Sequence, residues 1–176
     1  MKLSFYSLLI VSVFSLAACG DDEDTILNNE NIVGTWNLTM YDADAEISFG
    51  LGGVVAETTQ STSTLTESTV KITFNADGTW TSEGDLTITT TVDGMMETSE
   101  QSDGVGSGTY IVADGRLTMS DLDAGDEADV SDIEFDTNYT PDTRIEMNGT
   151  TTESDTDPLL GLEFTIDLDL SMVLER

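Results

Sequence analysis

The sequence predicts an antiparallel all-β fold, either a barrel or a sandwich, with about eight to ten strands. Apolar residues recur at every second position along most of the chain, which is the period of a half-buried strand. Asp-Gly pairs separate several of these alternating runs, as in tight hairpins. No long window shows a helical period, so consecutive strands are expected to be joined by hairpins and to pair antiparallel.

Residues 1–18 are predicted to be a secretory signal. Lys2 is a short cationic region, an apolar run follows, and the small residues Ala17 and Ala18 precede Cys19. The apolar run is shorter than the ~20 residues that a membrane-spanning helix needs.

The segment Leu16-Ala17-Ala18-Cys19 resembles the lipobox of bacterial lipoproteins. The resemblance implies that the Cys19 thiol receives a diacylglycerol, that the signal is removed, and that the new amino group is acylated. The protein would then be attached to the membrane by an N-terminal lipid anchor, which is firm when two or more acyl chains insert. The alternative is an ordinary signal with a chance cysteine.

Residues 19–31 are predicted to form a lipidated acidic tether. The run Gly20-Asp21-Asp22-Glu23-Asp24 resembles the acidic tether that marks surface export in Bacteroidetes-type lipoproteins. A plain solvated linker would have the same composition. The expected location is therefore the outer membrane, with the domain at the cell surface or on the periplasmic face.

Residues 32–176 have a uniform composition and are predicted to form one domain. In chain order, strands are expected at 32–39, 70–74, 86–92, 116–120, 145–147 and 162–174. The last of these alternates strictly, from Leu162 to Leu174, and its length predicts a bend, a twist or a bulge. Turns are expected at Asp77-Gly78, Asp93-Gly94 and Asp114-Gly115, where Asp-Gly supplies the positive φ of a tight hairpin.

Three segments resemble lipocalins and lipocalin-like bacterial lipoproteins. They are Gly34-Thr35-Trp36, the hairpin Phe74-Asn75-Ala76-Asp77-Gly78-Thr79-Trp80, and the strand around Gly108-Thr109-Tyr110, in the order of that family. The resemblance implies an antiparallel up-and-down β-barrel with an apolar interior, and it favours the barrel over the sandwich. It also implies that an arginine late in the chain covers Trp36, for which Arg176 is the candidate.

In classical lipocalins the interior can hold a small hydrophobic molecule. The resemblance therefore implies candidate ligand-lining residues, namely Trp36, Phe74, Trp80, Tyr110 and Phe164. A plain core is the favoured interpretation of the same aromatic residues, although an eight-stranded barrel is wide enough either to be filled by side chains or to hold one small ligand.

The composition excludes several functions. The chain has 5 Lys+Arg against 35 Asp+Glu and no histidine, with a formal net charge of −30. Because five cationic residues cannot neutralise a run of phosphates, nucleic acid is not expected as a partner. Without histidine there is neither a histidine-based nucleophile system nor an imidazole metal ligand, and one cysteine excludes an internal disulfide. We expect no enzymatic activity and no cofactor.

The acidic run 121–129 contains weak candidates for a calcium site, namely Asp121, Asp123 and Asp126. It departs from the EF-hand pattern because its glycine, Gly125, comes one place early and no helix flanks it. A solvated acidic loop is the alternative. Lys71 is expected to be a surface charge, since it lies on the polar face of its strand.

Two functions remain open from the sequence. In the first, the barrel would bind a small hydrophobic ligand. In the second, the barrel would be filled by side chains, and the protein would be a non-catalytic structural or interaction lipoprotein with an unknown protein partner. Two polar stretches, Glu57 to Glu67 and Glu97 to Gly108, are rich in Ser and Thr on both faces and are expected to project beyond a barrel.

Overall fold

The computed structural model describes residues 26–51, 54–101, 104–123, 129–156 and 162–176. These residues form eleven strands and no helix, and every strand pairing between them is antiparallel. The strands are β1 (Gly34–Leu51), β2 (Val54–Ser68), β3 (Lys71–Phe74), β4 (Thr79–Glu83), β5 (Leu86–Val92), β6 (Met95–Gln101), β7 (Ser107–Ala113), β8 (Arg116–Asp123), β9 (Asp129–Thr140), β10 (Arg144–Thr156) and β11 (Leu162–Glu175). Within these ranges we find no helix long and apolar enough to cross a membrane.

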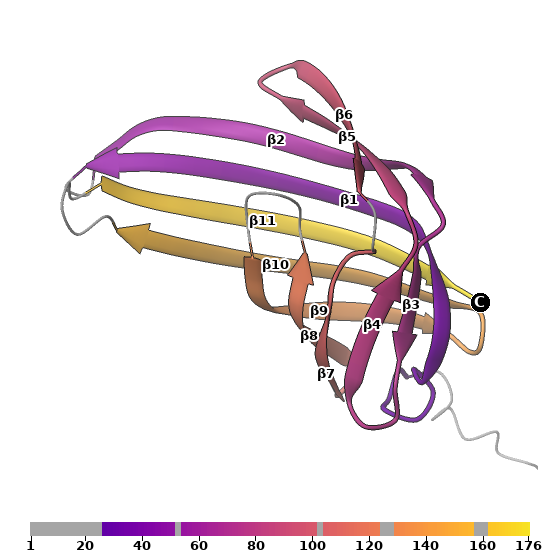
Figure 1. Cartoon of the computed structure of the whole chain (residues 1–176). Helices are drawn as coiled ribbons and strands as arrows, with labels where there is room; N and C mark the ends of the chain where they lie inside the picture. Colours follow the sequence, from indigo (N-terminus) through magenta and orange to yellow (C-terminus); the bar gives the residue numbers. More distant parts are fainter. Residues whose placement is uncertain (1–25, 52–53, 102–103, 124–128, 157–161) are drawn as a thin grey trace, which may run out of the picture.

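Eight of the strands form a closed ring. Their order is β1-β3-β4-β7-β8-β9-β10-β11, and pairing of β11 with β1 closes the circle. The remaining strands, β2, β5 and β6, continue the sheet outward from the far half of β1 (Figure 1). If β2 with β3, β4 with β5, and β6 with β7 are each counted as one long strand, every strand lies beside the next one in the chain. The topology is therefore a meander, as the alternating pattern with hairpin turns predicts.

The strand count exceeds the predicted eight to ten because three long strands are each broken at one level of the sheet. The breaks lie between β2 and β3, between β4 and β5, and between β6 and β7. At this level the Thr69 amide donates to the Asp85 carbonyl at 2.8 Å, and the Gly104 amide donates to the Gly84 carbonyl at 2.8 Å. Gly84 has a φ of 112°, a backbone conformation that favours glycine.

Strand β1 bends at the same level without a break. Its register with β11 shifts between Leu38 and Met40, and the Thr39 hydroxyl donates to the Val173 carbonyl at 3.3 Å. Such a bulge adds one residue to one strand and increases the local bend. The sequence predicts an irregularity in the long C-terminal strand, and the bulge lies instead on its partner strand β1.

Beyond this bend the sheet no longer closes on itself. We call this part the extension, and it comprises residues 42–51, 54–68, 86–101, 150–156 and 162–171. Its strand order is β6-β5-β2-β1-β11-β10. The extension includes β2, and with it the polar stretch from Glu57 to Glu67, which projects beyond the ring as the sequence predicts. Of the second polar stretch, residues 97–101 lie in the extension, whereas 107–108 belong to the ring strand β7.

The main core lies inside the ring. Trp36, Trp80, Phe74 and Phe135 are its largest side chains, and each is no more than 1% exposed. Aliphatic residues from β3, β8, β9, β10 and β11 fill the space between them, including Ile72, Leu117, Met119, Ile133, Ile145, Met147 and Leu174. The packed chain begins before residue 32, because Leu27 is 2% exposed and belongs to this core.

The hairpin turns confirm the role predicted for Asp-Gly. Asp93 and Asp114 have φ values of 48° and 53°, and the glycines that follow them have φ values of 83° and 76°. Two successive residues with positive φ make the turn whose twist matches that of the flanking strands. Gly78, with a φ of 83°, follows Asp77 in the turn that joins β3 to β4.

Candidate functional site

The structure brings together four of the five predicted ligand-lining residues. Trp36, Phe74, Trp80 and Tyr110 all lie in the ring and are at most 5% exposed. The Phe74 and Tyr110 rings meet edge to face, with their centroids 5.0 Å apart. Phe74 and Trp80 are cross-strand partners of β3 and β4. All four side chains therefore belong to the buried core of the ring.

The polar atoms of these aromatic side chains are bonded within the protein. The Trp36 indole N–H donates to the Ile32 carbonyl at 2.7 Å, and that of Trp80 donates to the Ser120 carbonyl at 3.1 Å. The Tyr110 hydroxyl donates to the Asn75 carbonyl at 2.8 Å. Among the described residues, every buried side-chain nitrogen or oxygen has such a partner. These bonds fix the rings in place as structural groups.

Two groups have shifted pKa values, Asp77 in the β3–β4 turn and Tyr110 of β7, which contacts that turn. The Thr79 hydroxyl donates to the Asp77 carboxylate at 2.6 Å, and this bond, with that of the Thr79 amide, holds the pKa of Asp77 below its ordinary value. Burial, and then the nearby Asp77 charge, raise the pKa of Tyr110. Both shifts follow from hydrogen bonds and burial that fix the turn.

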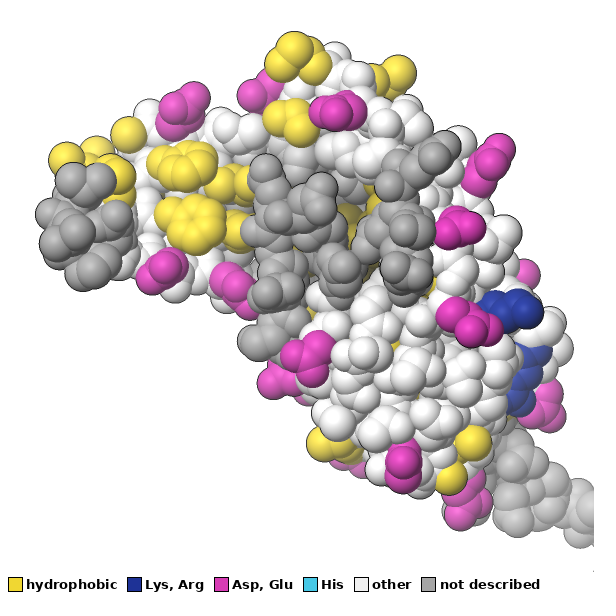
Figure 2. All heavy atoms as spheres, in the orientation of Figure 1, with side chains coloured by type: hydrophobic (Ala, Val, Ile, Leu, Met, Phe, Trp, Pro, Cys, Tyr) yellow, Lys and Arg dark blue, Asp and Glu magenta, His cyan; other side chains and the backbone are white. Residues whose placement is uncertain are grey.

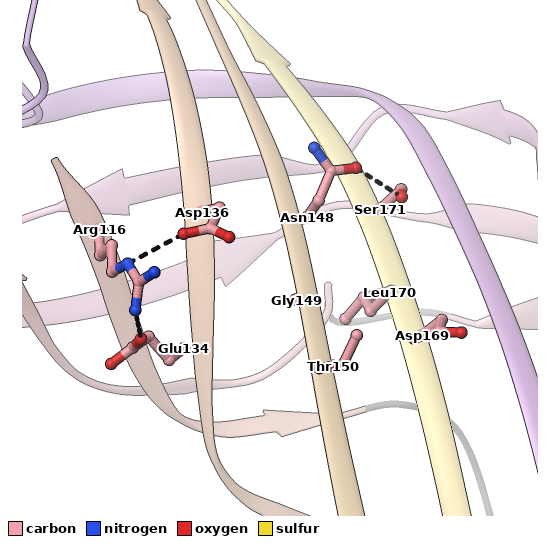
Figure 3. Close-up of a pocket in the computed structure, with 9 residues that line it drawn as sticks. All are labelled: Arg116, Glu134, Asp136, Asn148, Gly149, Thr150, Asp169, Leu170 and Ser171. Carbon is pink, nitrogen blue, oxygen red and sulfur yellow. Dashed lines mark hydrogen bonds and ion pairs between the residues drawn. The ribbon is translucent and has the colours of Figure 1, made fainter.

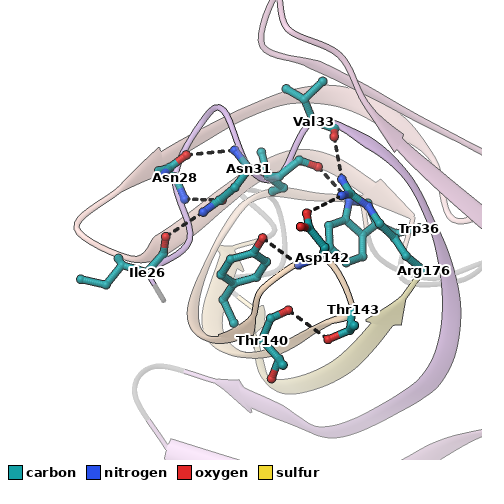
Figure 4. Close-up of polar contacts among 11 residues, drawn as sticks. Ile26, Asn28, Asn31, Val33, Trp36, Thr140, Asp142, Thr143 and Arg176 are labelled. Atoms are coloured by element: carbon teal, nitrogen blue, oxygen red, sulfur yellow. Dashed lines mark hydrogen bonds and ion pairs between the residues drawn. The ribbon is translucent and has the colours of Figure 1, made fainter. Parts of the chain in front are cut away.

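Near the start of β1, Arg176 covers Trp36 (Figure 4). The guanidinium carbon lies 4.0 Å from the Trp36 ring centroid. One guanidinium nitrogen donates to the Val33 carbonyl at 2.6 Å, and another lies 3.3 Å from the Asp142 carboxylate. The contact implied for Arg176 by the sequence resemblance is therefore present, and it ties the C-terminus to the start of β1.

A shallow polar hollow lies on the outside of the ring, over Gly149 (Figure 3). Arg116 is the cation in its lining, and its guanidinium pairs with Glu134 at 2.6 Å and with Asp136 at 2.9 Å. Both carboxylates and the arginine are more than half exposed. Since the arginine is already paired and solvent-exposed, the hollow offers no concentrated charge to a ligand.

In the part of the chain that the structure describes, the candidate calcium ligands do not form a site. Asp121 is exposed, with a φ of 54°, and its carboxylate accepts a hydrogen bond from Ser120 at 2.9 Å. Asp123 ends β8, and Asp126 lies outside the described residues, as does Cys19. Across the ranges that the structure describes, no three acidic, cysteine or histidine side chains are grouped to hold a metal ion.

The fifth predicted residue, Phe164, lies away from the other four. It is on the extension, where it meets Phe49 of β1 with ring centroids 6.1 Å apart. Two further pairs continue this row on β1 and β11, so that the apolar stripe consists of Ile47, Phe49, Leu51, Leu162, Phe164 and Ile166. Phe49, Leu51 and Leu162 are 45%, 57% and 46% exposed.

The apolar stripe is a row of partly exposed hydrophobic side chains on one face of the extension. Next to it, at the β1–β2 end, Val54 and Val55 are 68% and 63% exposed. Figure 2 shows these hydrophobic side chains gathered on the part of the molecule that the extension forms, with acidic side chains at its margins. Contiguous exposed apolar surface of this kind marks interaction sites. Sequence reasoning missed Phe49 and Leu51, although the alternation of residues 41–51 was a readable signal.

No protein-family model, no curated protein and no solved structure matches the chain. The site therefore has to be interpreted from its own geometry.

Proposed function

We propose that the protein is a lipid-anchored, non-catalytic binding protein of the cell envelope, and that it recognises a hydrophobic partner through the apolar stripe. The observation that carries the proposal is the contrast between the buried side chains of Trp36, Trp80 and Phe74 in the ring and a row of exposed apolar side chains on the extension. A side-chain-filled lipocalin-like barrel would then be the scaffold, and the open sheet would be the recognition surface.

The anchoring half of the proposal rests on the lipobox resemblance at Cys19. It is tested by growing cells with an alkyne-tagged fatty acid and detecting label on the protein. We expect label on the wild type and none on Cys19→Ser. Labelling of neither protein would remove the lipid anchor from the proposal. Protease digestion of intact cells would then distinguish the cell surface from the periplasmic face.

The binding half is tested with a neutral hydrophobic dye, Nile red. We expect its emission to shift to the blue on the wild type, and its affinity to fall about tenfold in the double variant Phe49→Ser/Phe164→Ser, since two exposed aromatic contacts are lost. Ile26→Ser/Ile111→Ser removes two side chains that are 57% and 64% exposed elsewhere on the molecule. Equal losses in the two double variants would show that the stripe is not a binding surface.

A further inference from the structure

The apolar stripe has a defined size and shape. It is two strands wide, and its cross-strand pairs are Ile47 with Ile166, Phe49 with Phe164, and Leu51 with Leu162. Ala45 pairs with Leu168 and continues the row towards the bend. At ~3.3 Å per residue, the seven residues from Ala45 to Leu51 span about 20 Å. The same length is covered by about 13 residues of an α-helix, whose diameter suits a surface two strands wide.

Carboxylates border the stripe on both sides of the same face. In an antiparallel sheet, directly paired residues point to the same face. Glu57 of β2 pairs with Phe49, while Glu153 and Asp155 of β10 pair with Ile166 and Phe164. We call Glu57, Glu153 and Asp155 the acidic rim.

The acidic rim lacks neighbouring cations. The described Lys and Arg residues are Lys71, Arg116, Arg144 and Arg176, and all four lie outside the extension. No ion pair found among the described residues includes Glu57, Glu153 or Asp155. The extension therefore presents an apolar centre between two negative margins that nothing in the described chain neutralises.

This charge pattern selects among the possible occupants. A second copy would bring its own acidic rim against the first, with both chains at a net charge of −30. An anionic membrane surface is repelled for the same reason. An apolar helix with positive charges on its flanks satisfies both the stripe and the rim.

We propose that the extension binds a basic amphipathic helix of a partner protein. The apolar face of the helix lies on the stripe, and its flanking Lys or Arg residues pair with Glu57 on one side and with Glu153 and Asp155 on the other. The inference rests on the proposed function, because it names the partner of the same surface. A helix that packs on one face of a sheet completes a two-layer arrangement in which both apolar surfaces are buried.

The proposal is tested with three designed peptides of about 14 residues, matched to the length of the stripe. They share one pattern of leucines and carry Lys, Gln or Glu at all other positions. At about 0.15 M NaCl we expect the Leu/Lys peptide to bind the protein about tenfold more tightly than Leu/Gln, because its lysines pair with the three rim carboxylates. Leu/Glu should bind most weakly.

A matched pair of variants separates local pairing from general attraction. Glu57→Gln/Glu153→Gln/Asp155→Asn removes the acidic rim. Asp44→Asn/Glu46→Gln/Asp169→Asn removes three carboxylates from the opposite face of the extension, so both variants lose three negative charges. We expect the rim variant to lose about tenfold in affinity for Leu/Lys and the opposite-face variant to lose less than about twofold. Equal losses would overturn the proposal.

The design also distinguishes failure of this inference from failure of the proposed function. Tight binding of Leu/Gln that disappears in Phe49→Ser/Phe164→Ser, without preference for Leu/Lys, would leave the stripe as a binding surface and refute the basic helix. Binding of every peptide that is unchanged in Phe49→Ser/Phe164→Ser would refute both. Sedimentation of the free protein as a dimer that this double variant dissociates would identify a second copy as the occupant and overturn the proposal.

Discussion

The ring and the extension share the strands β1 and β11, but the residues on the inward face of those strands are buried in the ring and exposed in the extension. At the ring end, Trp36 of β1 and Leu174 of β11 are fully buried. At the far end, Phe49 and Leu162 of the same two strands are nearly half exposed. The alternating sequence pattern is the same at both ends. The difference is that strands from the other side close over the ring core, and no described strand does so over the extension.

The two regions also differ in charge. The four described cations lie at the ring, where Arg116, Arg144 and Arg176 form ion pairs with carboxylates. The outer face of the extension instead places like charges opposite each other, Asp44 with Asp169 and Glu46 with Asp167. Directly opposed like charges destabilise a sheet. We therefore expect stability to be concentrated in the ring, which leaves the extension for the recognition role that we propose.

The largest expected contrast comes from removing one phenylalanine from each region. Phe74→Ala empties a site that is 1% exposed, and we expect it to lower the free energy of unfolding by about 3–5 kcal/mol. Phe49→Ala acts at a site that is 45% exposed, and a loss below about 1 kcal/mol is expected. Urea unfolding of both variants measures the difference. Similar losses would mean that the extension is as tightly packed as the ring.

A smaller effect is expected at the bend between the two regions. A Cβ at Gly84 would lie 2.6 Å from the Thr69 carbonyl oxygen, and the φ of 112° disfavours any other residue. We expect Gly84→Ala to destabilise by about 2–3 kcal/mol. Gly94→Ala is the control, because Gly94 has a φ of 83° but no atom within 4 Å of the added Cβ. Its expected cost, about 1 kcal/mol, comes from φ alone. Equal melting temperatures for both variants would contradict close contact at the bend.

The arginines of the ring provide the third test. Arg176→Ala removes the contact with Trp36 and the bond to the Val33 carbonyl, and we expect a loss of about 1–2 kcal/mol. Arg116→Ala removes ion pairs whose members are more than half exposed, and a change within about 0.5 kcal/mol is expected. Thermal melting distinguishes the two. A larger loss at Arg116 would reverse the assignment of Arg176 as the anchor of the C-terminus.

Neutralising one of two opposed carboxylates is expected to stabilise the extension. Asp169→Asn relieves repulsion from Asp44, so stability should rise by about 0.2–1 kcal/mol at low ionic strength. The gain should shrink near ~1 M NaCl, where charges are screened within ~3 Å. Asp136→Asn is the control, because Asp136 is paired with Arg116, and it should bring no gain. A gain that is independent of salt would exclude electrostatic repulsion as its cause.

The smallest expected effect is a pH dependence at the β3–β4 turn. The pKa of Asp77 is lowered in the folded state by the bonds from Thr79, so its ionised form is favoured by folding. The resulting stability is present above the ordinary carboxyl pKa and is lost as the pH falls through the lowered folded value. The stability difference between the wild type and Asp77→Asn should therefore narrow on acidification. A difference that widens towards acid pH would contradict the sign of this shift.

The strands and hairpins of the ring could be predicted from the sequence because their signals are local, whereas those signals alone left a barrel and a sandwich open. Alternation at residues 70–74, 116–120 and 162–174, with Asp-Gly at the turns, defines strands and hairpins without any knowledge of tertiary contacts. The breaks at Gly84 and near Thr69 could not be predicted, because they depend on where neighbouring strands bend together. Because of these breaks the structure has eleven strands, where the sequence predicts eight to ten.

The candidate site was harder to predict. Alternation at every second residue shows which side chains share one face of a strand, but it does not show what packs on that face. Phe164 was predicted to line the same interior as Trp36, and the structure instead pairs it with Phe49 on the extension. The rim residue Glu57 becomes a neighbour of Phe49 only through the register of β1 and β2. Such cross-strand relations depend on register, which a single strand's pattern does not fix.

Native-state amide hydrogen exchange, with and without the Leu/Lys peptide, tests most directly the division between a stable ring and a recognising extension. In the free protein, we expect the amides of Ile72, Leu117 and Met147 to exchange only through global unfolding, and those of Phe49 and Phe164 to exchange through local opening of the extension. Adding the peptide should slow exchange in the extension alone. Uniform exchange across both regions, or protection by the peptide at the ring, would contradict the account.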